Sequence, residues 1–168
     1  LRIYLYHIPP VAQVPITIQL IEKLIKNYPN IVVGIKDSSG DWANTKAMLD
    51  CQWDDFRIFV GSENYLLQNM EHGGSGCISA TANINPRGIK ELCDNWDKEN
   101  SHELQKYLTQ IRNSFSNFPL IPALKSYLAG YLKEKIWLLP RPPLTPLSKK
   151  DTTLLAENLG NINFKFSN

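Results

Sequence analysis

Four short apolar runs alternate with longer stretches of helical period over the first hundred residues, and this alternation limits the possible folds more than any other feature. The runs lie near residues 2–6, 31–36, 57–61 and 76–80, and each is almost continuously apolar or β-branched. Such runs are typical of strands that are buried on both faces of a parallel sheet. Strands that alternate with helices predict an α/β fold of four βα units joined by right-handed crossovers.

The remainder of the 168-residue chain predicts a helical extension. Residues 101–160 carry apolar side chains at helical spacing on both sides of a Pro-rich connector. Ser148 and Asp151 form the pattern of a capping box before the last helix. The final segment, residues 161–168, is expected to be a frayed tail. The chain is too short for a complete eight-fold β/α barrel, which typically takes about 250 residues.

Composition excludes several classes of partner. Lys and Arg number 18 against 16 Asp and Glu, and the net charge of +2 gives no electrostatic case for nucleic acid or an anionic membrane. No apolar run approaches the roughly 18 residues of a spanning helix. Three cysteines and three histidines lack the spacing of a disulfide framework or a metal centre. We therefore expect no metal site. We also expect a cytoplasmic location, because no signal-peptide pattern opens the chain.

Lys36 is the most informative candidate for chemistry, because function in parallel βα architectures collects at the carboxyl ends of the strands. Lys36 ends the apolar run at residues 31–35. Desolvation at such a place lowers the pKa of a lysine and frees its lone pair for attack on a carbonyl. The alternative, which the residue alone favours, is a lysine whose ammonium simply reaches water. Asp37 is expected to point to the opposite face of the strand.

Other strand ends add weaker candidates. Tyr6 ends the first run and carries a phenol suited to relaying protons, although strand tyrosines usually pack. Ser38 is either a ligand contact or a strand end. Asp41 is expected to cap a helix. The glycines of residues 73–76 precede their strand, whereas a phosphate cradle follows one, and so they predict a tight turn.

Taken together, the strand ends resemble the dihydrodipicolinate synthase / N-acetylneuraminate lyase family. The motifs follow one another in the family's order and spacing over nearly the whole chain. They are residues 6–9 (YHIP), 34–41 (GIKDSSGD), 61–63 (GSE), 76–83 (GCISATAN), 122–125 (PALK) and 141–144 (RPPL).

The resemblance implies the C-terminal half of a (β/α)8 barrel, at residues 1–100, and a class I aldolase-type lyase. In that family the lysine matching Lys36 forms a Schiff base with pyruvate or another 2-oxo acid, and the tyrosine matching Tyr6 relays protons. Ile78 and Ser79 are expected to line the pyruvyl end of the pocket, with Ser38 and Gly61 as further substrate contacts. The resemblance implies no cofactor, because the lysine itself forms the covalent Schiff base with the substrate. It also implies a homo-oligomer, which in this family is a tetramer.

Two departures from the family pattern leave alternatives open. Val11 stands where synthases of lysine biosynthesis usually carry an arginine that grips the aldehyde's carboxylate. This favours another 2-oxo acid lyase, with 4-hydroxy-tetrahydrodipicolinate synthase proper as the alternative. The family's first four βα units are also absent from this sequence. The glycine-threonine loop that binds the 2-oxo acid carboxylate in the family belongs to those units and is absent too. Two explanations are open. The chain is a fragment of a longer enzyme, or it is a truncated non-catalytic homologue that acts only through assembly with another chain.

Overall fold

The computed structural model describes residues 1–166, which divide into two compact units. The first unit consists of residues 1–79 and 92–101, and the second of residues 80–91 and the chain from residue 102 onward. No helix among the described residues is long and apolar enough to cross a membrane. The same residues contain no group of three or more His, Cys, Asp or Glu side chains placed to hold a metal ion.

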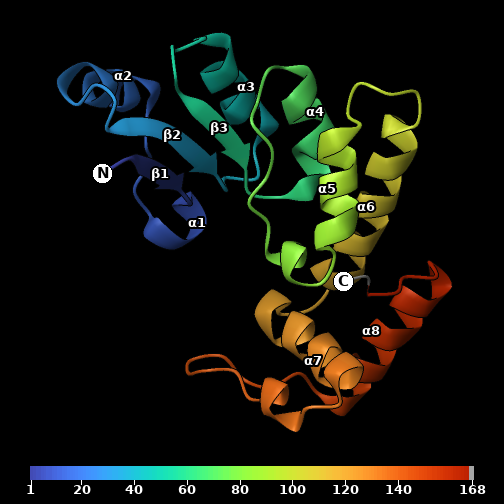
Figure 1. Cartoon of the computed structure of the whole chain (residues 1–168). Coiled ribbons are helices and arrows are strands. Elements are labelled where there is room, and N and C mark those ends of the chain that lie inside the picture. Colours follow the sequence, from blue (N-terminus) through green and yellow to red (C-terminus); the bar gives the residue numbers. More distant parts are fainter. Residues whose placement is uncertain (167–168) are drawn as a thin grey trace. The chain divides into compact units, whose positions relative to one another are not determined.

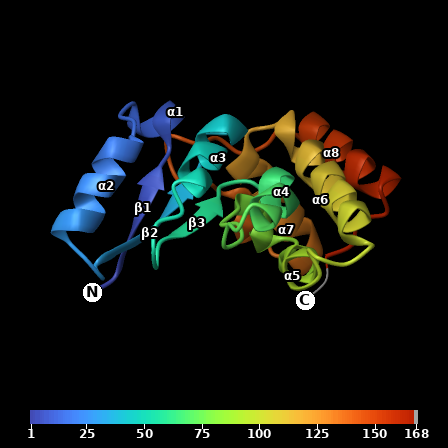
Figure 2. The ribbon, with the colours of Figure 1, turned by 90° about the horizontal axis from the view of Figure 1, so that it is seen from above.

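A three-stranded parallel sheet forms the centre of the first unit (Figures 1 and 2). Its strands are β1 (Ile3–His7), β2 (Val32–Asp37) and β3 (Arg57–Val60), in the order β1-β2-β3. The middle strand is buried almost throughout, as its nearly continuous apolar sequence predicts. The α/β class expected from the sequence is thus confirmed.

The fourth expected strand, at residues 76–80, is not formed as a strand. Only one parallel bridge is present there, between Val60 and Cys77. Gly76 has a φ of 122°, and the chain enters the 3-10 helix η2 (Ala80–Asn83) directly after Ser79. The extended segment is therefore bounded on both sides by turns and is too short for a regular ladder.

Helices α2 (Ile18–Asn27) and α3 (Trp42–Asp50) cover one face of the sheet. The first unit also contains α1 (Pro9–Ala12), the 3-10 helix η1 (Glu63–Tyr65) and α4 (Leu66–Glu71). Ile21 of α2 and Met48 of α3 pack with Ile35 and Ile58 of the sheet in one buried cluster. Because side chains alternate along a strand, Lys36 projects from the face opposite to Ile35 and the two helices.

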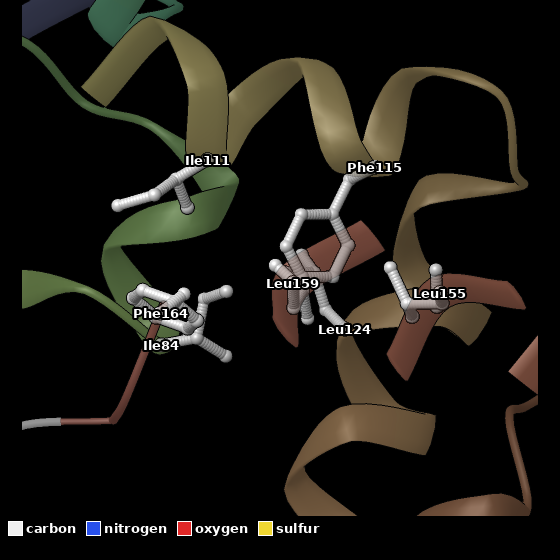
Figure 3. Packing of buried hydrophobic residues seen from close by; sticks show 8 residues of the cluster. Ile84, Ile111, Phe115, Leu124, Leu155, Leu159 and Phe164 are labelled. Atoms are coloured by element: carbon white, nitrogen blue, oxygen red, sulfur yellow. The ribbon is translucent and has the colours of Figure 1, made fainter. Parts of the chain in front are cut away.

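The second unit is helical. It contains part of α5 (Pro86–Asp94), α6 (Ser101–Ser116), α7 (Leu120–Leu132), the 3-10 helix η3 (Lys135–Leu138) and α8 (Lys149–Asn161). Phe115 of α6, Leu124 of α7 and Leu159 of α8 meet in its buried core, which Figure 3 shows. Ser148 caps α8 as expected, because its Oγ accepts from Asp151 N at 3.1 Å. The Asp151 carboxylate accepts from the Ser148 hydroxyl at 2.7 Å, whereas in a capping box it accepts from the backbone amide of the cap residue.

The expectation of a frayed tail from residue 161 is wrong for the described part. Phe164 is only 8% exposed and belongs to the core of the second unit. The Phe166 amide donates to Tyr127 Oη at 3.1 Å, and the centroid of the Phe166 ring lies 4.4 Å from that of Tyr131. Burial of aromatic rings offsets the tendency of a terminus to fray. Residues 167–168 of the expected tail lie outside the described residues.

Candidate active site

Lys36 and Tyr6 meet on the sheet face that the helices leave uncovered. The parallel register of β1 and β2 places the two residues side by side. Lys36 Nζ donates a hydrogen bond to Tyr6 Oη at 3.2 Å and lies 4.3 Å from the centroid of the Tyr6 ring. Half of the Tyr6 side chain is exposed. An amine and a phenol in direct contact, open to a ligand, form a pair that can exchange a proton.

The environment of Tyr6 favours its ionised form. Partial burial by itself raises the pKa of the Tyr6 phenol. Hydrogen bonds from Lys36 and Ser38, together with the positive charge of Lys36, outweigh burial and lower this pKa below its ordinary value. The phenol therefore gives up its proton more readily than a free tyrosine.

Asp37 serves the opposite face of the sheet, as the strand alternation predicts. Its carboxylate is 3% exposed and accepts hydrogen bonds from Ser39 N at 2.9 Å, Asn44 Nδ2 at 2.9 Å and Thr45 Oγ1 at 2.7 Å. Asp41 caps α3 by accepting from the Ala43 amide, so the predicted cap is confirmed. These two carboxylates shape the turn after β2 and so hold Ser38.

Ser38 connects Tyr6 to the end of the third strand. Its amide donates to His7 O at 2.7 Å, and its side chain lies close enough to Tyr6 to lower the pKa of the phenol. Gly61 N donates to Asp37 O at 2.6 Å, which brings the Gly61 backbone against Ser38. A Cβ atom at residue 61 would lie 2.8 Å from Ser38 Cα, so the close approach requires glycine. The structure thus brings four of the expected site residues together: Tyr6, Lys36, Ser38 and Gly61.

Ile78 and Ser79 form a second group, joined to the end of β3. The Ile78 amide donates to Val60 O at 2.9 Å, and the Ile78 side chain is about half exposed. Ser79 is 8% exposed, and its hydroxyl donates a short hydrogen bond to the carboxylate of Glu63. The side chain of Ser79 is therefore directed to Glu63.

Glu63 is the residue that sequence reasoning missed. It is 1% exposed and stands in the first turn of η1, which Ser62 caps by accepting from Asn64 N at 3.3 Å. The available signal was an acidic side chain two residues after Gly61, in the turn that follows β3. Its burial was not predictable from sequence, because carboxylates are rarely buried unless they are paired.

The pKa of the Cys77 thiol reflects the charges around this second group. Burial raises the pKa of its thiol to about 12, and the negative charge of Glu63 adds to the effect, whereas the positive charge of Lys36 opposes it. The thiol is therefore protonated at neutral pH. Both Glu63 and Lys36 lie within electrostatic reach of the segment at residues 77–79.

Comparison with known proteins points to one family. The model of the Dihydrodipicolinate synthetase family matches residues 1–162. An uncharacterized DapA-like lyase of Chloroflexus aurantiacus is 32% identical over 155 residues, which are 92% of this chain and 51% of the relative. A 4-hydroxy-tetrahydrodipicolinate synthase of Thermus thermophilus is 34% identical over 161 residues, 93% of this chain and 53% of the relative.

The solved structures show the same fold. YagE, a prophage protein of E. coli K12 from the dihydrodipicolinic acid synthase family, superposes with a TM-score of 0.81 at 24% identity. That structure is a complex with pyruvate, and the superposition covers 97% of this chain and 56% of YagE. The chain spans about half the length of the curated relatives it matches.

Proposed function

Because the chain belongs to the dihydrodipicolinate synthetase family, we propose that it carries the nucleophile of a Schiff-base-forming lyase that acts on pyruvate or a related 2-oxo acid. The observation that carries this proposal is the contact of Lys36 Nζ with Tyr6 Oη at 3.2 Å. A lysine in direct contact with a proton-accepting phenol has the arrangement that amine nucleophiles require.

Lys36 attacks the 2-oxo carbon as the neutral amine. The phenolate form of Tyr6 takes the proton that the ammonium must lose, and the lowered pKa of Tyr6 makes that form more accessible. Attack gives a carbinolamine, which loses water to form an iminium. The iminium withdraws electrons from the adjacent carbon, so that carbon loses a proton to give an enamine. The enamine then forms a C–C bond with an aldehyde carbon, and the reverse sequence cleaves that bond. The Schiff base itself serves as the electron sink.

The remaining site residues position the substrate in this proposal. Ser38 lies beside Tyr6, and Gly61 lies against Ser38. Both residues flank the reacting carbons in this proposal. Ile78 and Ser79 line the pyruvyl end. The pyruvate found in YagE supports a small 2-oxo acid as the ligand of this family.

The proposed architecture is the C-terminal half of a (β/α)8 barrel at residues 1–100, followed by a helical extension at 101–160. The coverage of about half of each relative supports it. The other half, with the loop for the 2-oxo acid carboxylate, then comes from a longer protein or from a second chain. We extend the proposal to a homo-oligomer located in the cytoplasm.

We propose that the electrophile is an aldehyde that carries no carboxylate, because Val11 offers no positive charge to bind one. Val11 is largely exposed, and residues 8–17 contain no charged side chain. A valine cannot form an ion pair with a carboxylate. The second candidate is 4-hydroxy-tetrahydrodipicolinate synthase activity, which the name of the Thermus relative favours.

Borohydride trapping tests the proposal. The natural protein that carries residues 1–168 is incubated with pyruvate and sodium borohydride, and the modified peptide is identified by mass spectrometry. We expect a reduced pyruvyl group on Lys36 and its loss in Lys36→Arg. Lys125→Arg is the matched control, because Lys125 Nζ also lies over an aromatic ring, 5.1 Å from the centroid of Trp137. Absence of any adduct on Lys36 would instead favour a non-catalytic homologue that acts through assembly.

A further inference from the structure

Glu63 is a buried carboxylate that the proposed chemistry does not use. It is 1% exposed, and the Ser79 hydroxyl donates a short hydrogen bond to it. A carboxylate taken out of water is stable only when hydrogen bonds replace its hydration. The hydrogen bond to Glu63 therefore fixes the orientation of the Ser79 side chain. Bonds from a hydroxyl to a carboxylate are about twice as strong as those between neutral groups.

Backbone hydrogen bonds also join the segment before Ser79 to β3, one of them from the Val60 amide to Gly76 O at 3.1 Å. Cys77 forms a single bridge to Val60, and the Ile78 amide donates to Val60 O at 2.9 Å. Directly after Ser79 the chain turns into η2. Glu63 follows Val60 by three residues. The segment is therefore bonded to the end of β3 by backbone hydrogen bonds and, through the contact of Ser79 with Glu63, by a side chain next to that end.

We propose that Glu63 is a positioning residue, which acts through Ser79 to fix the Ile78–Ser79 backbone where it receives the 2-oxo acid. This inference rests on the proposed function, which assigns Ile78 and Ser79 to the pyruvyl end of the pocket. Glu63 does not touch the reacting atoms in this role. Its loss weakens substrate binding and leaves the proton transfer between Lys36 and Tyr6 in place.

Two independent measurements test the proposal in the natural protein that carries this sequence. The first is the pyruvate concentration that gives half of the maximal rate of borohydride trapping at Lys36. The second is the hydrogen-exchange rate of the Ile78 amide, followed by NMR without substrate. The variants are Ser79→Ala, Glu63→Ala and the conservative Glu63→Gln, whose amide oxygen still accepts from Ser79. Ser126→Ala is the matched control, since Ser126 is 6% exposed and bonds Thr152 in the second unit.

For Ser79→Ala and Glu63→Ala we expect the half-saturating pyruvate concentration to rise roughly tenfold, with the maximal trapping rate unchanged. The Ile78 amide should exchange roughly tenfold faster in the same variants. Glu63→Gln should stay within about threefold of wild type in both measurements, and Ser126→Ala should match wild type. Ser79→Ala keeps the proposal testable if Glu63→Ala fails to fold.

Unchanged exchange at Ile78 in Ser79→Ala would overturn the positioning role. So would faster exchange with an unchanged half-saturating concentration, because the segment would then not serve the 2-oxo acid. Absence of an adduct in the wild type is a failure of the proposed function instead. The exchange measurement then decides by itself whether Glu63 holds the segment.

Discussion

Lys36 and Asp37 are consecutive residues of β2 whose side chains serve opposite faces of the sheet. Lys36 Nζ meets Tyr6 Oη at 3.2 Å on the open face, whereas Asp37 is buried against α3 and accepts from Thr45 Oγ1 at 2.7 Å. The amine and the carboxylate are therefore not an ion pair. One residue presents chemistry to a ligand, and its neighbour anchors the turn that holds Ser38.

Replacing Tyr6 by Phe removes the phenol and keeps the ring. We expect the rate of pyruvate trapping at Lys36 to fall roughly 100-fold, because the proton acceptor next to the amine is lost. Tyr4→Phe is the control, since Tyr4 lies on the neighbouring part of β1, where its ring contacts Phe59. Equal trapping rates in Tyr6→Phe and Tyr4→Phe would remove the relay role from Tyr6.

Thr45→Val deletes one donor to Asp37 with little change of shape. The buried carboxylate then loses a hydrogen bond at 2.7 Å, and we expect the free energy of unfolding to fall by about 1–3 kcal/mol. Thr153→Val removes an exposed hydroxyl bond within α8 and should change stability by less than about 0.5 kcal/mol. Urea unfolding of both variants measures the difference. A loss in Thr45→Val no larger than in the control would contradict the anchoring role of Asp37.

Gly61→Ala places a methyl group against Ser38. The Cβ atom would lie 2.8 Å from Ser38 Cα, so the backbone must shift, and we expect a loss of about 1–3 kcal/mol of stability. Trapping at Lys36 should slow as well, because Ser38 helps to lower the pKa of Tyr6. In contrast, Gly130→Ala in α7 meets nothing within 4 Å and should gain about 0.5–1 kcal/mol. Thermal or urea unfolding distinguishes the two, and a neutral Gly61→Ala would disprove the close contact.

Cys77 is expected to make the free energy of unfolding decrease at alkaline pH. Its thiol has an ordinary pKa of 9.0, which the fold raises to about 12. Between these values the unfolded chain has lost a proton that the folded chain keeps, so stability falls as pH rises above 9. The slope from this group is at most about 1.4 kcal/mol per pH unit. Cys77→Ala should flatten the decline in unfolding free energy from pH 8 to pH 11, and an unchanged slope would show that the thiol ionises normally.

Sequence periodicity was sufficient for the first three strands and for the side of β2 on which each residue lies. It also placed Lys36, Tyr6 and Ser38 at strand ends, whereas Gly61 was indicated by the family resemblance. It misjudged residues 76–80 and the segment after residue 161. The first is too short between turns for a ladder. The second is held by the rings of Phe164 and Phe166, whose partners lie far away in the chain.

The alternation of side chains along a strand is a local property, so the sequence by itself determined that Lys36 faces away from Ile35 and Asp37. Contacts between distant segments are not local. The tertiary structure alone decided that Tyr6, thirty residues from Lys36, reaches its amine, and that Ser79 bonds the buried Glu63. Those distances depend on the register of strands whose pairing is chosen by the packing of the whole core.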